Sequence, residues 1–519
     1  MFAVIIALAA VPFAAAVAAL FLPPRLCAAV TVVSGIVSFG LVLALIPAAA
    51  HHTLTYVSYF RVDAVSGIFM LATGFLYAAV AVYAAGYVGH EIQSESPATT
   101  RRYSMRFYGL FNVFAWSMLV APMMNSLALL WIAVEVTTVV SALLVAVENS
   151  EAAVEAAWKY VLIASAGLGL GLLATIFAYF AGAQLLGQHY DLALSTILHV
   201  GNRLPHTPVR FAFMLAVLGY GTKVGLFPVH TWLPDAHSEA PTPVSALLSG
   251  SLLAVSFYAI LRYYQIATTT LGTGFPRDVL LVFGVASLLL AALYLLDQRD
   301  LKRLLAYSSV EHMGILAIGV SFGAPIALAG VMLHVLAHAA AKGNAFMGAG
   351  VFTIKFGSKQ ISAQRGAMDV LPWTGPLFLL AVLALCAMPP FGIFRSEFQI
   401  VAGGFDAHGY AVAGVLIVLI TLAFLGLSAS ATSILFRPLR AAAEPMTPPR
   451  QHTGDGHGGQ VVTLTRAEAL PALSRGEPSA WMVAPMVAGV IALLVLGLHP
   501  PGELTELIAR AVAQLRGAA

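Results

Sequence analysis

The sequence predicts an all-α polytopic membrane protein with about fourteen transmembrane helices. Charged side chains make up 9% of its 519 residues, whereas about 25% is usual for a soluble globular protein. Hydrophobic residues account for 60%, and the mean hydropathy is +0.89. A soluble fold of this size could not cover its surface with so few charges. At about 20 apolar residues per crossing, the chain has room for more than a dozen spans.

Apolar runs bounded by polar residues, proline or glycine mark the expected helices. The expected ranges are 1–22, 26–49, 62–86, 107–122, 125–147, 156–183, 209–232, 240–265, 277–296, 301–322, 324–352, 371–394, 410–436 and 480–498. The first run has no basic residues before it and leads towards a second apolar run. This pattern favours a first crossing over a cleaved signal peptide.

Basic residues in the connections predict how the chain is oriented. The odd-numbered connections carry about twice as many Lys and Arg residues as the even-numbered connections and the tails together. Cytoplasmic loops are enriched in these residues, so we expect both termini on the outer side of a bacterial or archaeal cytoplasmic (inner) membrane. The Pro- and Gly-rich segment 437–479 reads as a flexible cytoplasmic loop, in which His452 and His457 are solvated rather than metal-bound.

Composition and motifs exclude several classes of protein. Cys27 and Cys386 lie far apart and cannot supply the four thiolates of an iron–sulfur cluster or the paired CxxC sites of a nickel–iron centre. Neither a P-loop nor a dinucleotide-binding fingerprint follows a strand pattern, and the net charge of +3 is too small to indicate nucleic acid. We therefore expect no catalytic, cofactor-binding or metal site. We also expect that the energy that drives this protein comes from an ion gradient or from a partner protein.

Ionisable residues inside apolar runs are the strongest functional signal, because each costs several kcal/mol at mid-membrane and usually serves transport. They are Glu135, Lys159, Lys223, Glu311, His312, His334, His338, Lys342 and Glu397. Lys159, Glu311 and Glu397 lie near helix ends, where the side chain can instead reach the interface. Glu135 and Lys223 have long apolar flanks, which makes that alternative weakest for them.

Two patterns among these residues suit proton transfer. A Glu135–Lys223 pair about 6 Å apart would attract by roughly 3 kcal/mol at an effective dielectric near 20, so moving its carboxylate would load or release a proton. His334, His338 and Lys342 are spaced i, i+4, i+8 and share one helix face. Because a neutral imidazole both accepts and donates, this stripe suits a hydrated proton path. Structural hydrogen bonding and an HxxxH metal site are the alternatives.

Proline interrupts two of the predicted spans, in GLFPVHTWLP after Lys223 and in CAMPPFGIF before Glu397. Freed carbonyls are tolerated in a membrane only beside protein or water. Broken helices at corresponding places in two halves are typical of transporters with internal repeats. The halves are 107–265 and 277–436, with five spans each and therefore inverted topology. An ordinary proline kink is the alternative.

Longer motifs indicate a family. TKVGLFPVHTWLPDAHSEAPTPVSALLSG (222–250) and DLKRLLAYSSVEHMG (300–314) resemble the antiporter-like proton-translocating subunits of respiratory complex I and of multisubunit cation–proton antiporters. AAWKYVLIASAG, YSSVEHMG and MPPFGIFRSEF are most similar to hydrogenase-4 component F. The resemblance covers about residues 100–436 and implies fourteen helices, two inverted five-helix repeats, and discontinuous helices 7 and 12.

The resemblance also implies roles and a domain layout. The implied proton-translocating positions are Glu135 on helix 5, Lys223 on helix 7, His230 and His237 near the helix-7 break, Lys342 on helix 11 and Glu397 on helix 12. The expected parts are helices 1–3 (1–106), the two repeats (107–265 and 277–436), the cytoplasmic loop (437–479), and the last transmembrane helix with a short amphipathic tail (480–519).

One departure from the family pattern matters. Related subunits usually have a lysine on helix 8, but SGSLLA places Ala254 there. A relay from Lys223 to Lys342 would then need water, or His334 and His338. The resemblance implies a subunit that moves H+ (or Na+/H+) in a group-4 hydrogenase-like or complex I-like assembly, with other membrane subunits and cytoplasmic redox subunits as partners. The alternatives are a proton-driven energiser of solute or inorganic-carbon uptake, and a non-pumping scaffold.

Overall fold

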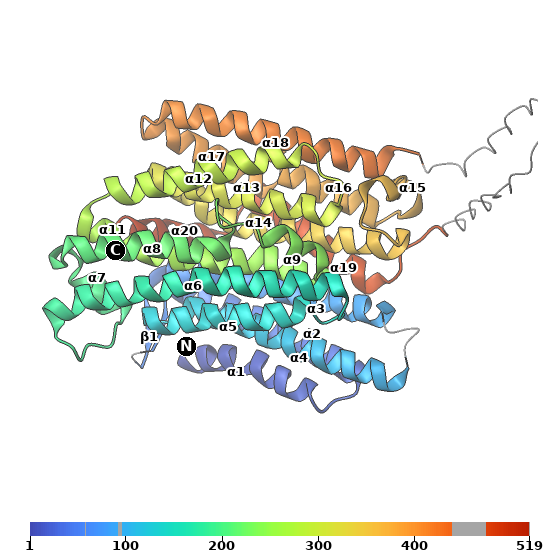
Figure 1. Ribbon diagram of the computed structural model, residues 1–519, viewed down its shortest axis with the longest axis horizontal. Helices are drawn as coiled ribbons and strands as arrows, with labels where there is room; N and C mark the ends of the chain where they lie inside the picture. Colours follow the sequence, from blue (N-terminus) through green and yellow to red (C-terminus); the bar gives the residue numbers. More distant parts are fainter. Residues whose placement is uncertain (58, 92–95, 439–473, 518–519) are drawn as a thin grey trace, which may run out of the picture.

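The computed structural model describes residues 1–57, 59–91, 96–438 and 474–517. Most of the expected loop 437–479, with His452 and His457, therefore lies outside the described residues. The described part is a bundle of long helices that run along one common direction (Figure 1). Both ends of the chain lie towards the same end of this bundle.

Helices form where the apolar runs predict them, with a few added short elements. In chain order they are α1 Phe2–Ala19, α2 Pro24–His51, β1 Leu54–Tyr56, β2 Phe60–Val62, α3 Ala64–Glu91, α4 Pro97–Val120, η1 Ala121–Met123, α5 Leu127–Val145, α6 Glu151–Leu186, α7 Leu194–His199, η2 Gly201–Arg203, α8 His206–Val224, α9 Leu233–Glu239, α10 Thr242–Leu247, η3 Leu248–Leu252, α11 Leu253–Leu271, α12 Gly274–Leu295, α13 Leu301–Phe322, α14 Pro325–Phe356, η4 Ile361–Ala363, α15 Ala367–Val370, α16 Thr374–Leu385, α17 Gly392–Asp406, α18 Tyr410–Phe436, α19 Ala480–Leu498 and α20 Gly502–Leu515. The hairpin β1–β2 and the short helix α7 have no counterpart among the predicted elements.

Eleven helices of the described chain are long and apolar enough to cross a membrane, taking α10, η3 and α11 as one element. Helices α4 and α8 and the pair α16–α17 were also predicted as crossings but are not among the eleven. Basic residues lower the hydropathy of α4 and α8, and the chain break leaves α16 with 12 residues and α17 with 15. The bundle is thus a mostly helical multi-span fold.

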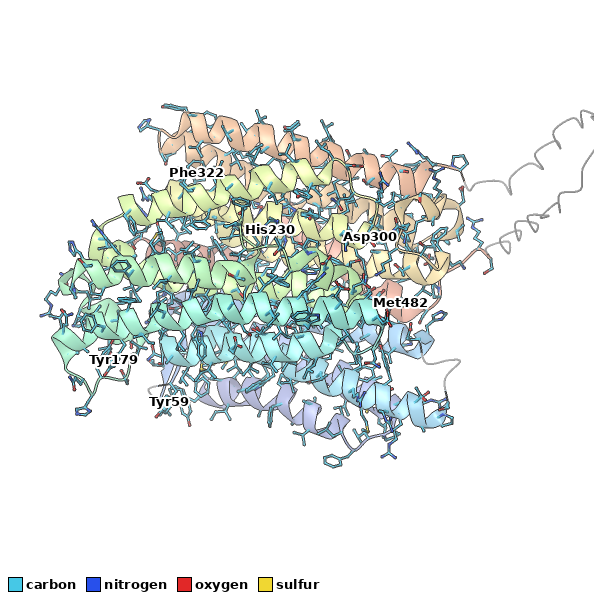
Figure 2. The ribbon with its side chains drawn as sticks, in the orientation of Figure 1. Tyr59, Tyr179, His230, Asp300, Phe322 and Met482 are labelled. Carbon is cyan, nitrogen blue, oxygen red and sulfur yellow. The ribbon has the colours of Figure 1, made fainter. Side chains whose placement is uncertain are left out.

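Two breaks interrupt the bundle where the prolines predict them. Helix α8 ends at Val224, where Gly225 caps it in the left-handed region with a φ of +82°, and α9 starts at Leu233. Helix α16 ends at Leu385 and the chain resumes as α17 at Gly392. The predicted boundary at residue 394 was too early, because α17 continues to Asp406 and includes Glu397. Figure 2 shows that His230, which belongs to the first break, lies between the two ends of the bundle.

A π-helical turn, η3, joins α10 to α11 next to Ala254. Such turns add one residue to a helix and loosen its hydrogen-bond ladder, and they occur frequently at functional sites. Here two hydroxyls from the turn bond to neighbouring helices. Ser249 Oγ lies 2.7 Å from Ser309 Oγ on α13, and Ser251 Oγ lies 2.7 Å from Thr73 Oγ1 on α3.

The tail forms the expected amphipathic helix, α20. Its apolar residues face α2 and α3, and Leu507 and Ala511 are fully buried. Polar contacts fix its end, because Gln265 Nε2 donates to the carbonyl of Gln514 at 3.0 Å. The tail therefore packs against the helix bundle and closes the end at which the chain terminates.

A buried ion pair between Arg262 of α11 and Asp63 lies at the same end of the bundle. Arg262 Nη2 on α11 lies 2.6 Å from Asp63 Oδ1 and 2.9 Å from Ser66 Oγ. Arg61 reaches the other oxygen of Asp63 at 3.2 Å, and Arg262 Nη1 donates to Gln265 Oε1 at 2.8 Å. Both members of the pair are buried. Asp63 thus joins the hairpin and α3 to α11, through residues nearly 200 positions apart.

Burial alone would raise the pKa of the Asp63 carboxyl, but the charges of Arg262 and Arg61, with hydrogen bonds from Arg262 and the Ser66 backbone, hold it well below its usual value. A carboxyl group with a lowered folded-state pKa stabilises the fold above its unfolded pKa, which is about 3.9 for Asp. This contribution is therefore present at neutral pH and is lost as the pH falls below about 4.

Breaking this pair should destabilise the protein strongly. We expect Asp63→Asn to lower the free energy of unfolding by about 3–5 kcal/mol, because Arg262 would remain buried with one charge partner removed. Thermal unfolding of the purified chain in detergent measures the change. The matched control is Arg303→Met, which breaks the half-exposed Arg303–Asp235 pair and should cost no more than about 1 kcal/mol. Equal losses in the two variants would contradict this assignment.

Candidate functional site

Lys223 lies at the centre of the first candidate site. It is fully buried near the end of α8, one residue before the helix stops at Val224. Its Nζ donates to Tyr160 Oη on α6 at 2.6 Å and to Thr138 Oγ1 on α5 at 3.0 Å. No ion pair within 4 Å involves Lys223 in the described part of the chain. Its two side-chain hydrogen-bond partners in the described structure are therefore hydroxyl groups.

These hydroxyls connect Lys223 to the predicted glutamate. Glu135 Oε2 is 3.5 Å from Thr138 Oγ1, and Glu135 Oε1 accepts a hydrogen bond from Ser165 at 3.1 Å. Glu135 is half-buried on α5, so it lies between the interior and the outer surface of the bundle. The structure thus brings Glu135 and Lys223 together through one threonine, without direct contact.

A second branch leaves Lys223 through Tyr160. Tyr160 Oη lies 2.8 Å from Ser141 Oγ, and Ser141 also bonds to the carbonyl of Thr137. If Ser141 uses its single proton on that carbonyl, Tyr160 donates to Ser141 and accepts from Lys223. The sequence analysis did not select Tyr160 or Thr138, because hydroxyl residues are common in apolar helices and carry no spacing signal.

Lys159 lies outside this cluster. Its side chain is 45% exposed and pairs with Glu155 at 2.5 Å and with Asp235 at 3.8 Å. This environment agrees with the alternative that it is a helix-end lysine at the interface. The neighbouring residue Tyr160, rather than Lys159, points to Lys223.

His230 and His237 lie on either side of the first break. His230 is buried in the connection between α8 and α9, and its Nδ1 has no hydrogen-bond partner among the described residues. His237 on α9 is fully buried, and both of its ring nitrogens lack a partner there. Its ring stacks on Trp232 at 6.3 Å and on Phe346 of α14 at 5.5 Å. Trp232 in turn lies 4.3 Å from the ring of Tyr160.

Lys342 is the corresponding lysine of the second half. It is fully buried on α14, and its Nζ donates to the carbonyl of Leu305 on α13 at 3.0 Å. Ser309 Oγ bonds to the same carbonyl and to Ser249 of the π-turn. Ser249 of the turn that precedes Ala254 is therefore linked, through Ser309, to the carbonyl that Lys342 contacts. Buried Glu311 on α13 is near enough to interact with Lys342, although no ion pair within 4 Å joins them among the described residues.

Three imidazoles and one carboxylate form a second buried cluster. His334 Nε2 on α14 lies 3.2 Å from His312 Nδ1 on α13, and that nitrogen lies 3.7 Å from Glu397 Oε1 on α17. The ring of His338 is 5.1 Å from that of His312, and neither of its nitrogens has a partner in the described structure. The cluster lies where α17 resumes after the second break. His312, noted in the sequence but absent from the family positions, is its central member.

Ser396 determines the tautomer of His334. The Ser396 hydroxyl donates to the carbonyl of Ile393 at 2.8 Å, so it can only accept from His334 Nδ1, which lies 2.9 Å away. A neutral imidazole then carries its proton on Nδ1 and presents Nε2 as an acceptor. His312 Nδ1 must donate to that acceptor, which leaves His312 Nε2 bare and without a partner among the described residues. The hydrogen bonds of the cluster therefore have one direction.

The same cluster is the buried group best suited to hold a cation in the described chain. One ligand atom each from His312, His334 and Glu397 lies within 4.8 Å of the others. The sequence analysis gave an HxxxH metal site as one alternative to proton transfer for the histidine stripe. Here the two ring nitrogens are joined by a hydrogen bond, an arrangement along which a proton can pass without a metal.

The site residues thus form two groups with an aromatic stretch between them. Glu135 and Lys223 belong to the first group, and His334, His338 and Glu397 to the second. Lys342 lies on the same helix as the two histidines. Another buried lysine, Lys302, was overlooked within DLKRLLAYSS although it is buried and donates to the carbonyl of Ala240 at 2.6 Å. Its position in the first turn of α13 gave it the appearance of a loop lysine.

Comparison with known proteins identifies the family. The family model described as "NADH:quinone oxidoreductase/Mrp antiporter, TM" matches residues 124–424, more than half of the chain. The chain belongs to this family. The matched range contains both groups of site residues and both helix breaks.

Relatives of this antiporter-like subunit are found in several kinds of complex. The present chain is 34% identical over 366 residues to the hydrogenase-4 component F homolog of Methylacidiphilum infernorum (isolate V4). The match covers 70% of this chain and 76% of that protein. The chain is 31% identical over 365 residues to NADH-quinone oxidoreductase subunit N of Desulforudis audaxviator (strain MP104C), with coverages of 69% and 68%. The predicted resemblance is confirmed, and the chain is a multi-pass membrane protein.

Solved structures confirm the antiporter-like fold. The chain matches a subunit of the membrane-bound sulfane sulfur reductase, an archaeal respiratory membrane complex, with a TM-score of 0.80, 18% identity and coverages of 98% and 97%. It matches a chain of the Mrp complex from Dietzia sp. DQ12-45-1b with a TM-score of 0.79, 22% identity and the same coverages. At these identities the likeness establishes the fold alone.

The tautomer of His334 can be tested by spectroscopy. We expect solid-state NMR of the 15N-histidine-labelled chain to show His334 protonated on Nδ1, with the signal assigned by its loss in His334→Gln. In Ser396→Ala the acceptor is gone, so the Nδ1–H form should lose its preference. The control Ser428→Ala removes a hydroxyl that bonds within α18, away from the cluster, and should leave the signal unchanged. An unchanged His334 signal in Ser396→Ala would refute the assignment.

Proposed function

We propose that this subunit translocates protons within a membrane complex related to complex I or hydrogenase-4, driven by redox chemistry in partner subunits. The observation that carries the proposal is the environment of Lys223, a fully buried amine whose Nζ donates hydrogen bonds to two hydroxyls. Hydroxyls accept a hydrogen bond from the ammonium form, and they can donate to the neutral amine. They therefore tolerate both protonation states of Lys223, whereas a direct ion pair would favour one.

Glu135 controls this switch in the proposed mechanism. A carboxylate near an ammonium stabilises it, and the attraction falls as the two separate. Thr138 separates Glu135 from Lys223, and Glu135 lies at the edge of the bundle, where a partner can reach it. A displacement or neutralisation of Glu135 would then release the proton of Lys223 through the Tyr160–Ser141 branch.

The second half provides the other proton site. Lys342 and the His312–His334–Glu397 cluster hold titratable groups in a chain of contacts beside the second break. Free carbonyls and water at a broken helix are the setting in which transporters bind ions. Protons would leave through Glu397. This role follows the family positions for Lys342 and Glu397 and the i, i+4 spacing for His334 and His338, and the contacts described above support it.

The fine topology is part of the proposal. We infer fourteen crossings, with α4, α8 and the two-part α16–α17 added to the eleven apolar spans, and two inverted repeats at 107–265 and 277–436. The bias of Lys and Arg towards the odd-numbered connections supports a cytoplasmic position for segment 437–479 and both termini outside. The location of both chain ends at one end of the bundle agrees with an even number of crossings.

Replacing the switch residue tests the function. We expect Lys223→Ala to abolish redox-coupled acidification of inverted membrane vesicles, measured by quenching of a pH-sensitive acridine dye, while the complex still assembles. The matched control is Lys159→Ala, because Lys159 lies in exposed ion pairs and its loss should leave most of the activity. Normal pumping by Lys223→Ala, with assembly verified, would contradict the mechanism.

The partners are a second test. One similar protein is named a hydrogenase-4 component F homolog, and another is a subunit of NADH-quinone oxidoreductase. We therefore expect redox subunits to co-purify with the tagged chain from gently solubilised native membranes, as identified by mass spectrometry. Co-purification of a few non-redox partners instead would favour the gradient-driven uptake function, and a redox complex that does not pump would favour the scaffold.

A further inference from the structure

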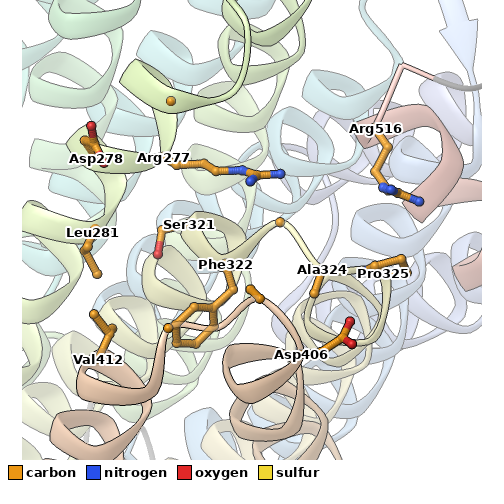
Figure 3. Close-up of a pocket in the computed structure, with 14 residues that line it drawn as sticks. Arg277, Asp278, Leu281, Ser321, Phe322, Ala324, Pro325, Asp406, Val412 and Arg516 are labelled. Carbon is orange, nitrogen blue, oxygen red and sulfur yellow. The ribbon is translucent and has the colours of Figure 1, made fainter.

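A pocket of about 430 Å³, lined by both charged and apolar side chains, opens at the end of the bundle at which α20 ends. It forms where α12, α14 and α18 begin and where α13 and α17 end. Figure 3 shows Arg277 extending across this pocket towards the side on which Arg516 lies, with Asp406 near Pro325. Asp278 lines the same pocket. Two positive and two negative side chains therefore meet there.

These four charges are available to a ligand. No ion pair within 4 Å joins any of them to another charged side chain in the described part of the protein. Arg277 is held over the turn between α13 and α14, because a Cβ at Gly323 would collide with its guanidinium. Arg277 thus interacts with Tyr264 of α11 but forms no ion pair, and its buried Nε–H is left without a hydrogen-bond partner in the described structure.

An apolar groove continues from this pocket along the outer surface of the bundle. Leu281 and Val412 line both the pocket and the groove. The groove has a volume of about 530 Å³. Its walls are side chains of α12 and α18, namely Leu281, Val282, Val285, Ala286, Leu289, Ala411, Val412 and Val415. From Leu281 to Leu289 it follows about 12 Å of helix, at 1.5 Å per residue.

We propose that pocket and groove together bind one phospholipid of the ethanolamine class, with its headgroup in the pocket and an acyl chain between α12 and α18. The continuity of a charged chamber with an apolar groove matches a molecule that has both parts. The pocket lies at the end of the spans, at the level of lipid headgroups, and the groove faces the hydrocarbon region. This inference goes beyond proton transfer and does not depend on it.

The balance of charges selects the headgroup. Arg277 and Arg516 can bind a phosphate, which arginine recognises through charge-assisted hydrogen bonds. Asp406 and Asp278 can accept hydrogen bonds from a primary ammonium, which has three N–H donors. A choline headgroup has no such donors, and a glycerol headgroup has no positive charge. The pocket therefore favours a zwitterion that donates hydrogen bonds.

Native mass spectrometry of the delipidated full chain, titrated with single lipids, tests the proposal. We expect palmitoyl-oleoyl phosphatidylethanolamine to bind at a concentration about tenfold lower than the choline or glycerol lipid with the same chains. The double variant Arg277→Ala/Arg516→Ala should lose about tenfold in affinity for the ethanolamine lipid. The control Arg102→Ala/Arg299→Ala removes two exposed arginines outside the pocket and should have no effect.

Two further variants keep the test independent of folding defects in the arginine variant. Asp406→Asn should reduce the preference for ethanolamine over choline without removing phosphate binding. Val412→Phe should fill the groove and weaken binding of the full lipid, while soluble phosphoethanolamine competes poorly in every variant. Equal binding of the three lipids, unchanged binding in the arginine variant, displacement by soluble phosphoethanolamine, or a partner subunit covering the groove in place of lipid would each overturn the proposal.

Discussion

The hydrocarbon interior of a membrane contains no water that could hydrogen-bond to polar groups, and the rest of the structure depends on this constraint. Each buried lysine of the two half-sites is accordingly held by specific oxygens, hydroxyls for Lys223 and a carbonyl for Lys342. Beside each break the titratable side chains, Lys223 and Glu397, are buried, although the prolines of the breaks are exposed. Breaks and buried charges occur together because each needs polar neighbours that only folded protein can supply.

The two half-sites solve this requirement differently. Lys223 is connected sideways, through Thr138, to a carboxylate at the edge of the bundle. The second half instead places imidazoles in series, and Ser396 imposes a direction on their hydrogen bonds. In the proposed mechanism, the first site is suited to respond to a change at Glu135. The second site is suited to pass a proton along its ordered hydrogen bonds.

Sequence patterns predicted the helices, the two breaks and both fully buried lysines, because apolar length, proline and isolated charge are local signals. They could not predict Tyr160, Thr138 or Ser396, since a hydroxyl residue in an apolar helix has many roles and its partner lies on another helix. Asp63 and Arg262 were missed for a similar reason, because nearly 200 residues separate them in sequence. The tertiary partner, rather than the residue type, gives these side chains their function.

The stack of rings between the two lysines has a consequence for how the halves communicate. Tyr160, Trp232, His237 and Phe346 follow one another at 4.3, 6.3 and 5.5 Å. A phenylalanine ring has no exchangeable proton, so a Grotthuss wire along this line is interrupted at Phe346. What rigid stacked rings can transmit is displacement. Along this line, protons would not pass from one half to the other. A movement of one half would instead be transmitted to the other through the packed rings.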